Sequence, residues 1–212
     1  MCGRFTLTSE FKEIQKHFAA SNEIAYNGSY NIPPSRNIAA VRHAQAEREL
    51  FLCHWGLIPH WAKSDNKHQA INARAESLTE KPYFRDTYKR RRCLIPANGF
   101  YEWKKDQDNK QAYYIHLPNR PIFAFAGLWD LWQSQDQSIE SCAIITTAAN
   151  AGMLTVHDRM PVILAEQDYD TWLATGEAKL LAPYTGPMEF YQVSKSVNNP
   201  RNDNQDLIRR LN

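Results

Sequence analysis

Short apolar segments rich in aromatic and β-branched residues dominate this chain, and they restrict its fold more than any other feature. Their length and residue content are typical of β-strands. Seven such segments cover residues 50–58, 93–103, 112–117, 122–132, 142–147, 161–164 and 190–193. The long helices of βαβ units are missing between them, so parallel pairing is not favoured. The sequence predicts an α+β fold with mainly antiparallel, twisted sheets or a barrel-like core and a few flanking helices.

Few segments have the periodicity of a helix. Apolar residues recur at helical spacing within residues 11–18, which predicts a short helix capped by Thr8 or Ser9. A second helix is expected to begin after a cap at Asp168 and to end near residue 175. A third, short helix is expected within residues 205–211. Helices are therefore a minor part of the expected fold.

The length and composition indicate one globular unit. The chain has 212 residues, of which 43% are hydrophobic and 23% charged, and a chain of this size buries roughly 70% of its unfolded surface. No repeat or linker divides it, so residues 1–212 are predicted to form a single domain. The longest apolar stretch, 122–132, is interrupted by Asp130, and the start lacks the apolar core of a signal peptide. We expect a monomeric, cytoplasmic protein with no membrane partner.

The four cysteines form no metal-binding pattern. Cys2, Cys53, Cys93 and Cys142 include no CxxC pair, and no histidine lies at zinc-finger spacing from them. Reduced thiols, no structural metal and no cofactor are therefore expected. Cys53 and Cys142 lie in apolar segments and are interpreted as core residues, and Cys93 is given the same interpretation.

Positive charge is concentrated in residues 81–110. This segment has nine Lys or Arg against four Asp or Glu, whereas the whole chain has a net charge of only +2. Aromatic residues lie among these charges, which suits a nucleic-acid backbone with bases stacked on rings. An ordinary solvated surface has the same composition. The residues alone leave both interpretations open.

Cys2 follows the initiator methionine, and this position allows an unusual chemistry. Removal of Met1 would leave an α-amine and a thiol on adjacent carbons of one residue. Such an aminothiol traps aldehydes, because the amine forms an imine and the thiolate then closes a five-membered thiazolidine ring. Small downward pKa shifts caused by nearby arginines such as Arg4 would activate either group. The alternative is a frayed terminus without a function.

Three polar clusters lie at or between the expected strands. In the first, Asn72 has an amide that donates and accepts hydrogen bonds, and Arg74 has a planar guanidinium suited to a phosphate. Glu102 lies within an aromatic strand, where it is either a general acid or base with a raised pKa or a solvent-facing residue. His157 lies between a valine and an aspartate and is followed closely by Arg159; it is either catalytic or an ordinary surface or core histidine.

Six motifs occur in order along the chain: MCGRF, WGLIP, INARAES, GFYEWK, TTAAN and VHDRMP. In this order and over this length they resemble the SOS-response-associated peptidase (SRAP) family, also called abasic-site processing proteins. The resemblance extends from Cys2 to the SKSVNNPRN segment near the end. It implies a single-domain fold peculiar to the family and a covalent function on damaged DNA.

The resemblance also implies roles for individual residues. Cys2 would be the crosslinking nucleophile, because an abasic site carries a masked aldehyde at C1′ of its deoxyribose. Asn72, Glu102 and His157 would sense or stabilise the opened sugar. Contacts to DNA would come from Arg4, Pro34, Trp61, Arg74, Trp103 and Arg159.

The resulting hypothesis is an abasic-site sensor of the DNA damage and SOS response. It would bind single-stranded DNA, or a junction of single and double strands, and form a covalent thiazolidine crosslink that shields the lesion. Lyase-like chemistry and autoproteolytic removal of Met1 are related expectations, as is association with the nucleoid when DNA is bound. Two alternatives are a cysteine peptidase with Cys2 as the N-terminal nucleophile and a DNA-binding module without chemistry.

Overall fold

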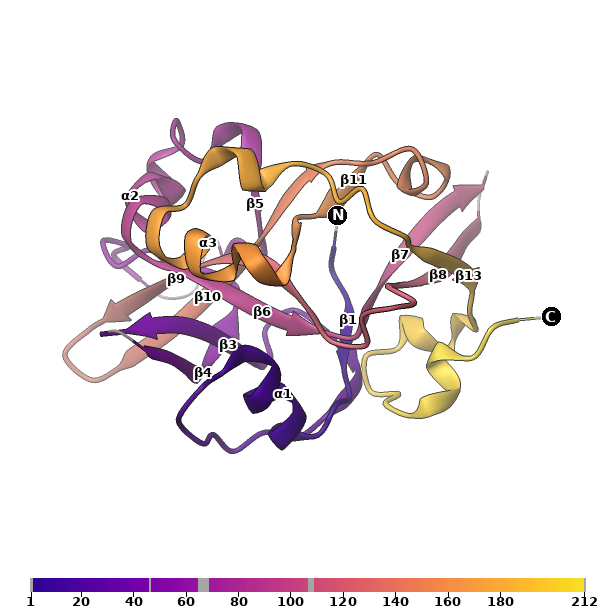
Figure 1. The fold of residues 1–212 in the computed structure, drawn as a ribbon, viewed down its shortest axis with the longest axis horizontal. Coiled ribbons are helices and arrows are strands. Elements are labelled where there is room, and N and C mark those ends of the chain that lie inside the picture. The colour runs from indigo at the N-terminus through magenta and orange to yellow at the C-terminus, as the bar shows by residue number, and fades with distance from the viewer. Residues whose placement is uncertain (1, 46, 65–68, 107–108, 212) are drawn as a thin grey trace.

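Two sheets and three α-helices make up the described part of the chain (Figure 1). The computed structural model describes residues 2–45, 47–64, 69–106 and 109–211. The strands are β1 (Phe5–Leu7), β2 (Ser29–Ile32), β3 (Asn37–Ala44), β4 (Glu47–Trp55), β5 (Asn72–Arg74), β6 (Arg92–Ala97), β7 (Gly99–Asp106), β8 (Asn109–His116), β9 (Phe123–Gln133), β10 (Ser138–Ala148), β11 (Arg159–Pro161), β12 (Ile163–Leu164) and β13 (Glu189–Gln192). The α-helices are α1 (Phe11–Phe18), α2 (Pro82–Arg90) and α3 (Tyr169–Thr175), and 3₁₀ turns cover Ala75–Ser77, Met153–Thr155, Glu166–Asp168, Ala178–Leu181, Lys195–Asn198 and Gln205–Ile208.

The larger sheet closes on itself. Its strand order is β11-β10-β4-β3-β6-β9-β12, and β9 also pairs with β10, so β10, β4, β3, β6 and β9 form a ring. Most neighbours in it are antiparallel, whereas β10 runs parallel to β4 and to β5. The smaller sheet has the order β13-β8-β7-β1-β2 and is antiparallel. The prediction of an α+β fold with mainly antiparallel sheets and a barrel-like core is confirmed.

One hydrophobic cluster joins the two sheets. It includes buried side chains from Cys2 to Leu181. Phe5 of β1 and Phe100 of β7 each meet Phe125 of β9 edge to face, with ring centroids 5.9 Å apart in both pairs. Such pairs add about 0.5–1.5 kcal/mol to the burial of the rings. The packing fastens β1 to the barrel and so fixes the position of the residues that precede β1.

All seven predicted strand segments contain observed strands, and four strands were not predicted. The segment 93–103 forms two strands, β6 and β7, because Asn98 interrupts it and accepts hydrogen bonds from the N–H groups of Thr8 and Ser9. Strands β1, β2, β3 and β5 escaped prediction because they are short or rich in alanine, which has little β-propensity. β5 lies within the first polar cluster, and it pairs with β10 over three residues.

The helix predictions are confirmed in part. α1 ends at Phe18 as predicted, but its N-cap is Glu10, because Thr8 and Ser9 are held by Asn98 instead. Asp168 precedes α3 as predicted, and the helix stops at Gly176, whose φ of 65° is the left-handed conformation that glycine tolerates. The terminal segment forms only a 3₁₀ turn, Gln205–Ile208. α2 was not predicted.

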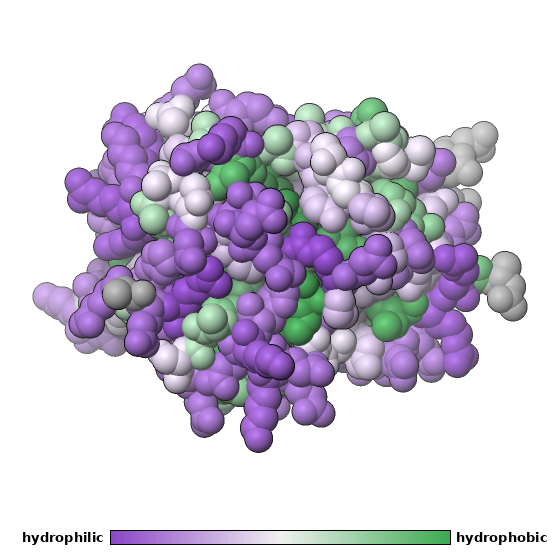
Figure 2. Space-filling view, viewed as in Figure 1, coloured by the Kyte–Doolittle hydropathy of each residue, from purple (hydrophilic) through white to green (hydrophobic). Residues whose placement is uncertain are grey.

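The face of the molecule seen in Figure 1 is largely hydrophilic. Figure 2 shows apolar side chains on this face mainly in the hollows between polar ones. No described helix has the length and apolar character needed to span a bilayer.

Candidate active site at the amino-terminal strand

Strand β1 carries the start of the chain to β7. Phe5 lies opposite Phe100, and the Tyr101 N–H donates a hydrogen bond of 2.9 Å to the Arg4 carbonyl oxygen. Because the two strands are antiparallel, the residues before Arg4 run beside those after Tyr101. Cys2 is thereby brought close enough to Glu102 for the carboxylate to affect the thiol electrostatically.

Asn72 holds Cys2 from the other sheet. It begins β5, which pairs with β10 of the barrel, and its Nδ2 donates a hydrogen bond of 2.9 Å to the Cys2 carbonyl oxygen. The Oδ1 atom of Asn72 is buried without a hydrogen-bond partner among the described residues. An unsatisfied buried acceptor costs about 1–3 kcal/mol. A ligand hydroxyl or N–H at this point would remove that cost.

The Cys2 side chain is fully buried. Burial raises the pKa of its thiol far above the usual range, and the nearby Glu102 carboxylate raises it further. This is the opposite of the downward shift that the sequence suggested through Arg4, because Arg4 contributes only a backbone hydrogen bond that lowers the pKa slightly. In the resting protein Cys2 is therefore a neutral thiol and not a thiolate.

Glu102 is a buried carboxyl group, with an exposed fraction of only 2%. Burial raises its pKa above the ordinary value, and the positive potential of His157 partly offsets this effect. The group therefore keeps its proton to a higher pH than a surface glutamate does, and a raised pKa suits a carboxyl group that acts as general acid or base. The interpretation of Glu102 as a solvent-facing strand residue is wrong.

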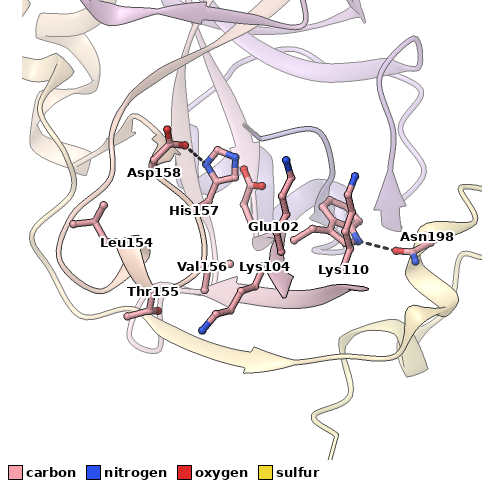
Figure 3. Close-up of a pocket in the computed structure, with 11 residues that line it drawn as sticks. Glu102, Lys104, Lys110, Leu154, Thr155, Val156, His157, Asp158 and Asn198 are labelled. Carbon is pink, nitrogen blue, oxygen red and sulfur yellow. Dashed lines mark hydrogen bonds and ion pairs between the residues drawn. The ribbon is translucent and has the colours of Figure 1, made fainter. Parts of the chain in front are cut away.

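His157 faces Glu102 from the segment before β11 (Figure 3). Its Nδ1 lies 2.9 Å from the backbone nitrogen of Arg159 and 2.9 Å from Oδ1 of Asp158. In the neutral ring Nδ1 can accept the Arg159 N–H bond, and in the protonated ring it can donate to Asp158. The loop thus provides a partner for either protonation state of this histidine.

A cleft of about 770 Å³ opens beside Glu102 and His157. The end of β7 and the start of β8 form one wall, and the segment 154–158 forms the other. The remaining lining residue is Asn198, whose Oδ1 accepts a hydrogen bond of 2.7 Å from Trp103 Nε1. Volumes of about 300–1,000 Å³ are typical of ligand sites. Of the four predicted catalytic residues, Glu102 and His157 line this cleft. Cys2 lies within electrostatic reach of Glu102, and Asn72 is hydrogen-bonded to Cys2.

Two predicted DNA contacts are engaged within the protein. Arg4 Nη1 donates to Asn31 Oδ1 at 2.7 Å and to the Val197 carbonyl oxygen at 2.8 Å, and its guanidinium lies 5.9 Å from the Trp103 ring. These contacts tie β1 to β2 and to the carboxy-terminal segment. Asn198 fixes the Trp103 ring in turn. In this conformation the Arg4 and Trp103 side chains bind other residues of the protein and hold the segments around the site together.

Arg159 and Arg74 both act on Glu76. Arg159 makes a two-pronged ion pair with Glu76, at 2.6 and 3.0 Å, and donates to the Thr146 carbonyl oxygen at 2.8 Å. Arg74 is exposed, and its charge reaches Glu76. Sequence reasoning missed Glu76, although its place in the INARAES motif was a signal for it.

The other two predicted DNA contacts lie on turns. Trp61 follows β4 and is 53% exposed, with its ring edge to face against Tyr83 at 6.2 Å. Pro34 lies in the turn between β2 and β3 and is half-buried. The exposed face of a tryptophan ring can stack against a nucleic-acid base.

The basic segment 81–110 is not one continuous face. Lys81, Arg85, Lys89 and Arg90 are exposed on or before α2, whereas Arg92 is buried and donates hydrogen bonds to carbonyl oxygens at the end of α3. The remaining described lysines lie on β7 and β8 and line the cleft: Lys104, Lys105 and Lys110. The interpretation of the whole segment as one surface strip is wrong for Arg92.

Some predictions concern residues outside this description. Met1 lies outside the described residues, so its removal stays a prediction. Within the described ranges no three His, Cys, Asp or Glu side chains are grouped as metal ligands. Cys53, Cys93 and Cys142 are buried, which confirms their interpretation as core residues.

The family described as "SOS response associated peptidase (SRAP)" matches residues 1–200. "Abasic site processing protein YoqW" of Bacillus subtilis is 43% identical, over 98% of this chain and 99% of that protein. "Abasic site processing protein HMCES" of Xenopus tropicalis is 29% identical, over 98% of this chain and 78% of that protein. The crystal structure of a protein from Bacteroides thetaiotaomicron has a TM-score of 0.88 and 25% identity, over 99% of this chain and 100% of that one. Because the family match spans nearly the whole chain and a relative at 43% identity spans 98% of it, this protein belongs to the SRAP family.

Proposed function

We propose that this protein processes abasic sites by forming a covalent crosslink between Cys2 and the ring-opened deoxyribose in single-stranded DNA. The observation that carries the proposal is the position of Cys2, buried beside a carboxyl group of raised pKa and held by Asn72. Relatives at 43% and 29% identity are named abasic site processing proteins. An abasic site supplies the aldehyde that an aminothiol captures.

The amine of Cys2 acts first in this mechanism. Removal of Met1 exposes it, and its nitrogen attacks C1′ of the opened sugar. Loss of water then gives an imine. The neutral amine is the nucleophile, so a base must accept its proton. Glu102 is suited to this step, because burial raises its pKa. Its pKa is therefore closer to that of the amine than the pKa of an ordinary carboxyl group is.

The thiol acts second, because the resting site disfavours the thiolate. The protonated imine places a positive charge next to Cys2, and an opposite charge at this distance lowers a thiol pKa. The thiol proton passes to a base, and the sulfur attacks the carbon of the protonated imine, forming the C–S bond while the C=N π electrons become the lone pair of the nitrogen, which keeps the proton it already carries. The product is a thiazolidine, and the balance of the two steps is aldehyde plus aminothiol giving thiazolidine plus one water.

His157 and Asn72 are assigned to the sugar. Ring opening requires a proton delivered to the ring oxygen and one removed from the C1′ hydroxyl, and His157 has a partner for each of its protonation states. The unsatisfied Oδ1 of Asn72 can accept a hydrogen bond from a sugar hydroxyl. Glu102 and His157 thus divide the work between the amine and the ring.

DNA binding is assigned to exposed arginine and aromatic side chains. Arg74 offers a charge for a phosphate and Trp61 a face for a base. For single strands the slope of log K against log salt is about −0.7 for each neutralised phosphate. Arg74→Ala is therefore expected to flatten the slope by about 0.7, and an unchanged slope would refute this contact.

The test is incubation with an oligonucleotide that carries one abasic site, followed by a denaturing gel. Wild-type protein is expected to give a band that survives denaturation, and mass spectrometry of the protein is expected to show that Met1 is missing. Cys2→Ala is expected to abolish the band, and Cys2→Ser to leave a hydrolysable imine. Cys142→Ala, which removes another buried thiol, is the matched control and should crosslink normally. An adduct of unchanged yield with Cys2→Ala would overturn the mechanism.

The roles of Glu102 and His157 are separated with a simple aldehyde, which has no ring to open. His157→Ala should slow capture of the abasic site much more than capture of the simple aldehyde. Glu102→Gln should slow both reactions by similar factors. The reverse pattern would exchange the two roles.

A peptidase acting on its own Met1–Cys2 bond is the second candidate, because the family description names a peptidase and Cys2 lies beside an acid or base. Expression of Glu102→Gln tests it. Wild-type protein and this variant are expressed in the same cells, which contain methionine aminopeptidase. If Met1 is removed from the wild-type protein but retained in the variant, self-cleavage is favoured.

A further inference from the structure

The turn after β4 is fastened to the barrel on both sides of Trp61. Before Trp61, the His60 N–H donates a hydrogen bond of 2.9 Å to Asp130 Oδ2, and His60 Nδ1 lies 3.0 Å from the same oxygen. After it, the Ala62 carbonyl oxygen accepts a hydrogen bond of 2.8 Å from Trp132 Nε1. The backbone is thus held directly before and directly after the residue that carries the exposed ring.

These contacts come from one face of two neighbouring strands. Asp130 and Trp132 lie two positions apart on β9, so their side chains leave the strand on the same side. Ser141 of β10 is directly opposite Asp130 and shares this face, and its Oγ accepts a hydrogen bond of 2.9 Å from the Ile58 N–H. The exposed fractions of Asp130, Trp132 and Ser141 are 1%, 6% and 0%. Three buried polar groups therefore bind the same turn.

The Asp130 carboxylate is the central contact. A buried charge destabilises a fold unless it is paired and hydrogen-bonded. Besides His60, this carboxylate has Arg91 as an ion-pair partner and accepts a hydrogen bond of 2.8 Å from the Leu131 N–H. Arg91 follows α2 directly, so Asp130 joins the turn to the end of that helix. An apolar residue at this position would hold neither partner.

Helix α2 supports the Trp61 ring from the side. It packs against β9 (Figure 1). The Tyr83 hydroxyl donates a hydrogen bond of 2.6 Å to the Leu57 carbonyl oxygen at the start of the turn, and the Tyr83 ring meets Trp61 edge to face at 6.2 Å. Trp61 nevertheless remains 53% exposed. The turn therefore presents an aromatic ring that its surroundings orient and that is still open to a ligand.

We propose that Asp130 and Trp132 are positioning residues for DNA binding, which hold the turn so that the Trp61 ring is oriented for stacking before DNA binds. The inference rests on the proposed function, in which Trp61 offers its face to a base. Ordering a mobile side chain during binding weakens the interaction, and a side chain that is already ordered avoids this loss. The effect of Asp130 and Trp132 on DNA affinity should therefore depend on Trp61.

The experiment is a double-mutant cycle with Trp61, measured by fluorescence anisotropy on a labelled, undamaged single-stranded oligonucleotide. This oligonucleotide contains no aldehyde, so binding is measured apart from crosslinking. Trp132→Phe removes the indole N–H and keeps an aromatic ring, and Asp130→Asn removes the charge. Trp172→Phe is the matched control, because it removes another buried indole N–H, which donates a hydrogen bond of 2.9 Å to a backbone carbonyl oxygen far from the turn.

Trp132→Phe and Asp130→Asn are each expected to weaken binding about fivefold, the effect of one side chain that must be ordered on binding. The salt slope should stay unchanged, because no phosphate contact is lost. In Trp61→Ala protein the same two changes should alter affinity by less than about twofold. Trp172→Phe should bind like its parent in both backgrounds.

Circular dichroism checks that each variant is folded at the assay temperature, and Trp132→Phe decides the test if Asp130→Asn is not folded. The proposal is overturned if Trp132→Phe binds like Trp172→Phe, if it weakens binding equally with and without Trp61, or if Trp61→Ala binds like wild type. Any of these results, together with a crosslink to abasic DNA, leaves the proposed chemistry standing. If the cycle is as expected but wild-type protein forms no crosslink, the chemistry fails and the positioning role stands.

Discussion

Arg92 and Arg90 belong to the same basic run, yet the structure predicts opposite consequences for their replacement. Arg92 is only 8% exposed, and its guanidinium donates hydrogen bonds to the carbonyl oxygens of Tyr88, Trp172, Leu173 and Ala174 at 2.7–3.3 Å. It therefore caps the end of α3 and ties that helix to the end of α2. Arg90 is exposed.

The cost of losing Arg92 follows from these bonds. Hydrogen bonds from a charged donor contribute about 1.5–3 kcal/mol each, and removing the donor leaves helix-end carbonyl groups buried. Because the bonds share one group their contributions do not add fully, and a loss of about 3–5 kcal/mol is expected for Arg92→Met. For a domain of this size 1 kcal/mol corresponds to about 2–4 °C in Tm. The melting temperature should fall by about 10 °C.

Urea unfolding followed by tryptophan fluorescence measures this difference. Arg90→Met is the matched control, with an expected change within about 0.5 kcal/mol. Below the unfolding transition, Arg92→Met should bind single-stranded DNA as wild type does. Equal stability of the two variants, or a loss of DNA affinity specific to folded Arg92→Met, would refute the assignment of Arg92 to the interior.

Three more predictions concern the site and its surroundings. Burial raises the pKa of Glu102, so the folded state holds this proton more tightly than the unfolded chain does. Ionisation of Glu102 therefore lowers the stability of the fold as pH rises from the unfolded pKa of about 4.3 through the folded one. Glu102→Gln should raise the urea midpoint of unfolding at pH 8 and leave it unchanged near pH 4. Trp61→Ala should weaken DNA binding by about 1–3 kcal/mol in a titration and leave thermal stability nearly unchanged, since the ring is 53% exposed. Asp130→Ala should destabilise the fold by about 3 kcal/mol in urea, because it removes a buried partner of Arg91 and His60.

The sequence predicts the strands of the barrel well because their burial depends on local pattern. Strand β9 is buried at nearly every position, and its apolar run is visible without any knowledge of its neighbours. β5 is different. It has only three residues. It is a strand because it pairs with β10, and its own composition does not predict one. The ring closure between β9 and β10 likewise depends on which strands meet, and no local pattern specifies that.

The site shows a similar division. Glu102 stands out in the sequence because a carboxylate in an aromatic strand is unusual, and its raised pKa is confirmed. The pKa of Cys2 was predicted in the wrong direction because a sequence shows neighbouring charges but not burial. Lys105 and Lys110 were recognised only as part of a charged segment, since their direct pairing depends on the register of a hairpin.

Register also explains how the GFYEWK motif serves both the fold and the site. A Cβ at Gly99 would lie 2.3 Å from the Tyr114 hydroxyl oxygen, so only glycine lets β7 lie this close to that ring. Tyr114 in turn shares a hydrogen bond of 3.0 Å with Thr6 of β1. The same contact thus aligns β1, β7 and β8. A slip of one residue along β7 would turn the Glu102 side chain to the other face of the sheet, away from Cys2. The glycine three residues before the carboxylate is therefore part of what places the acid beside the thiol.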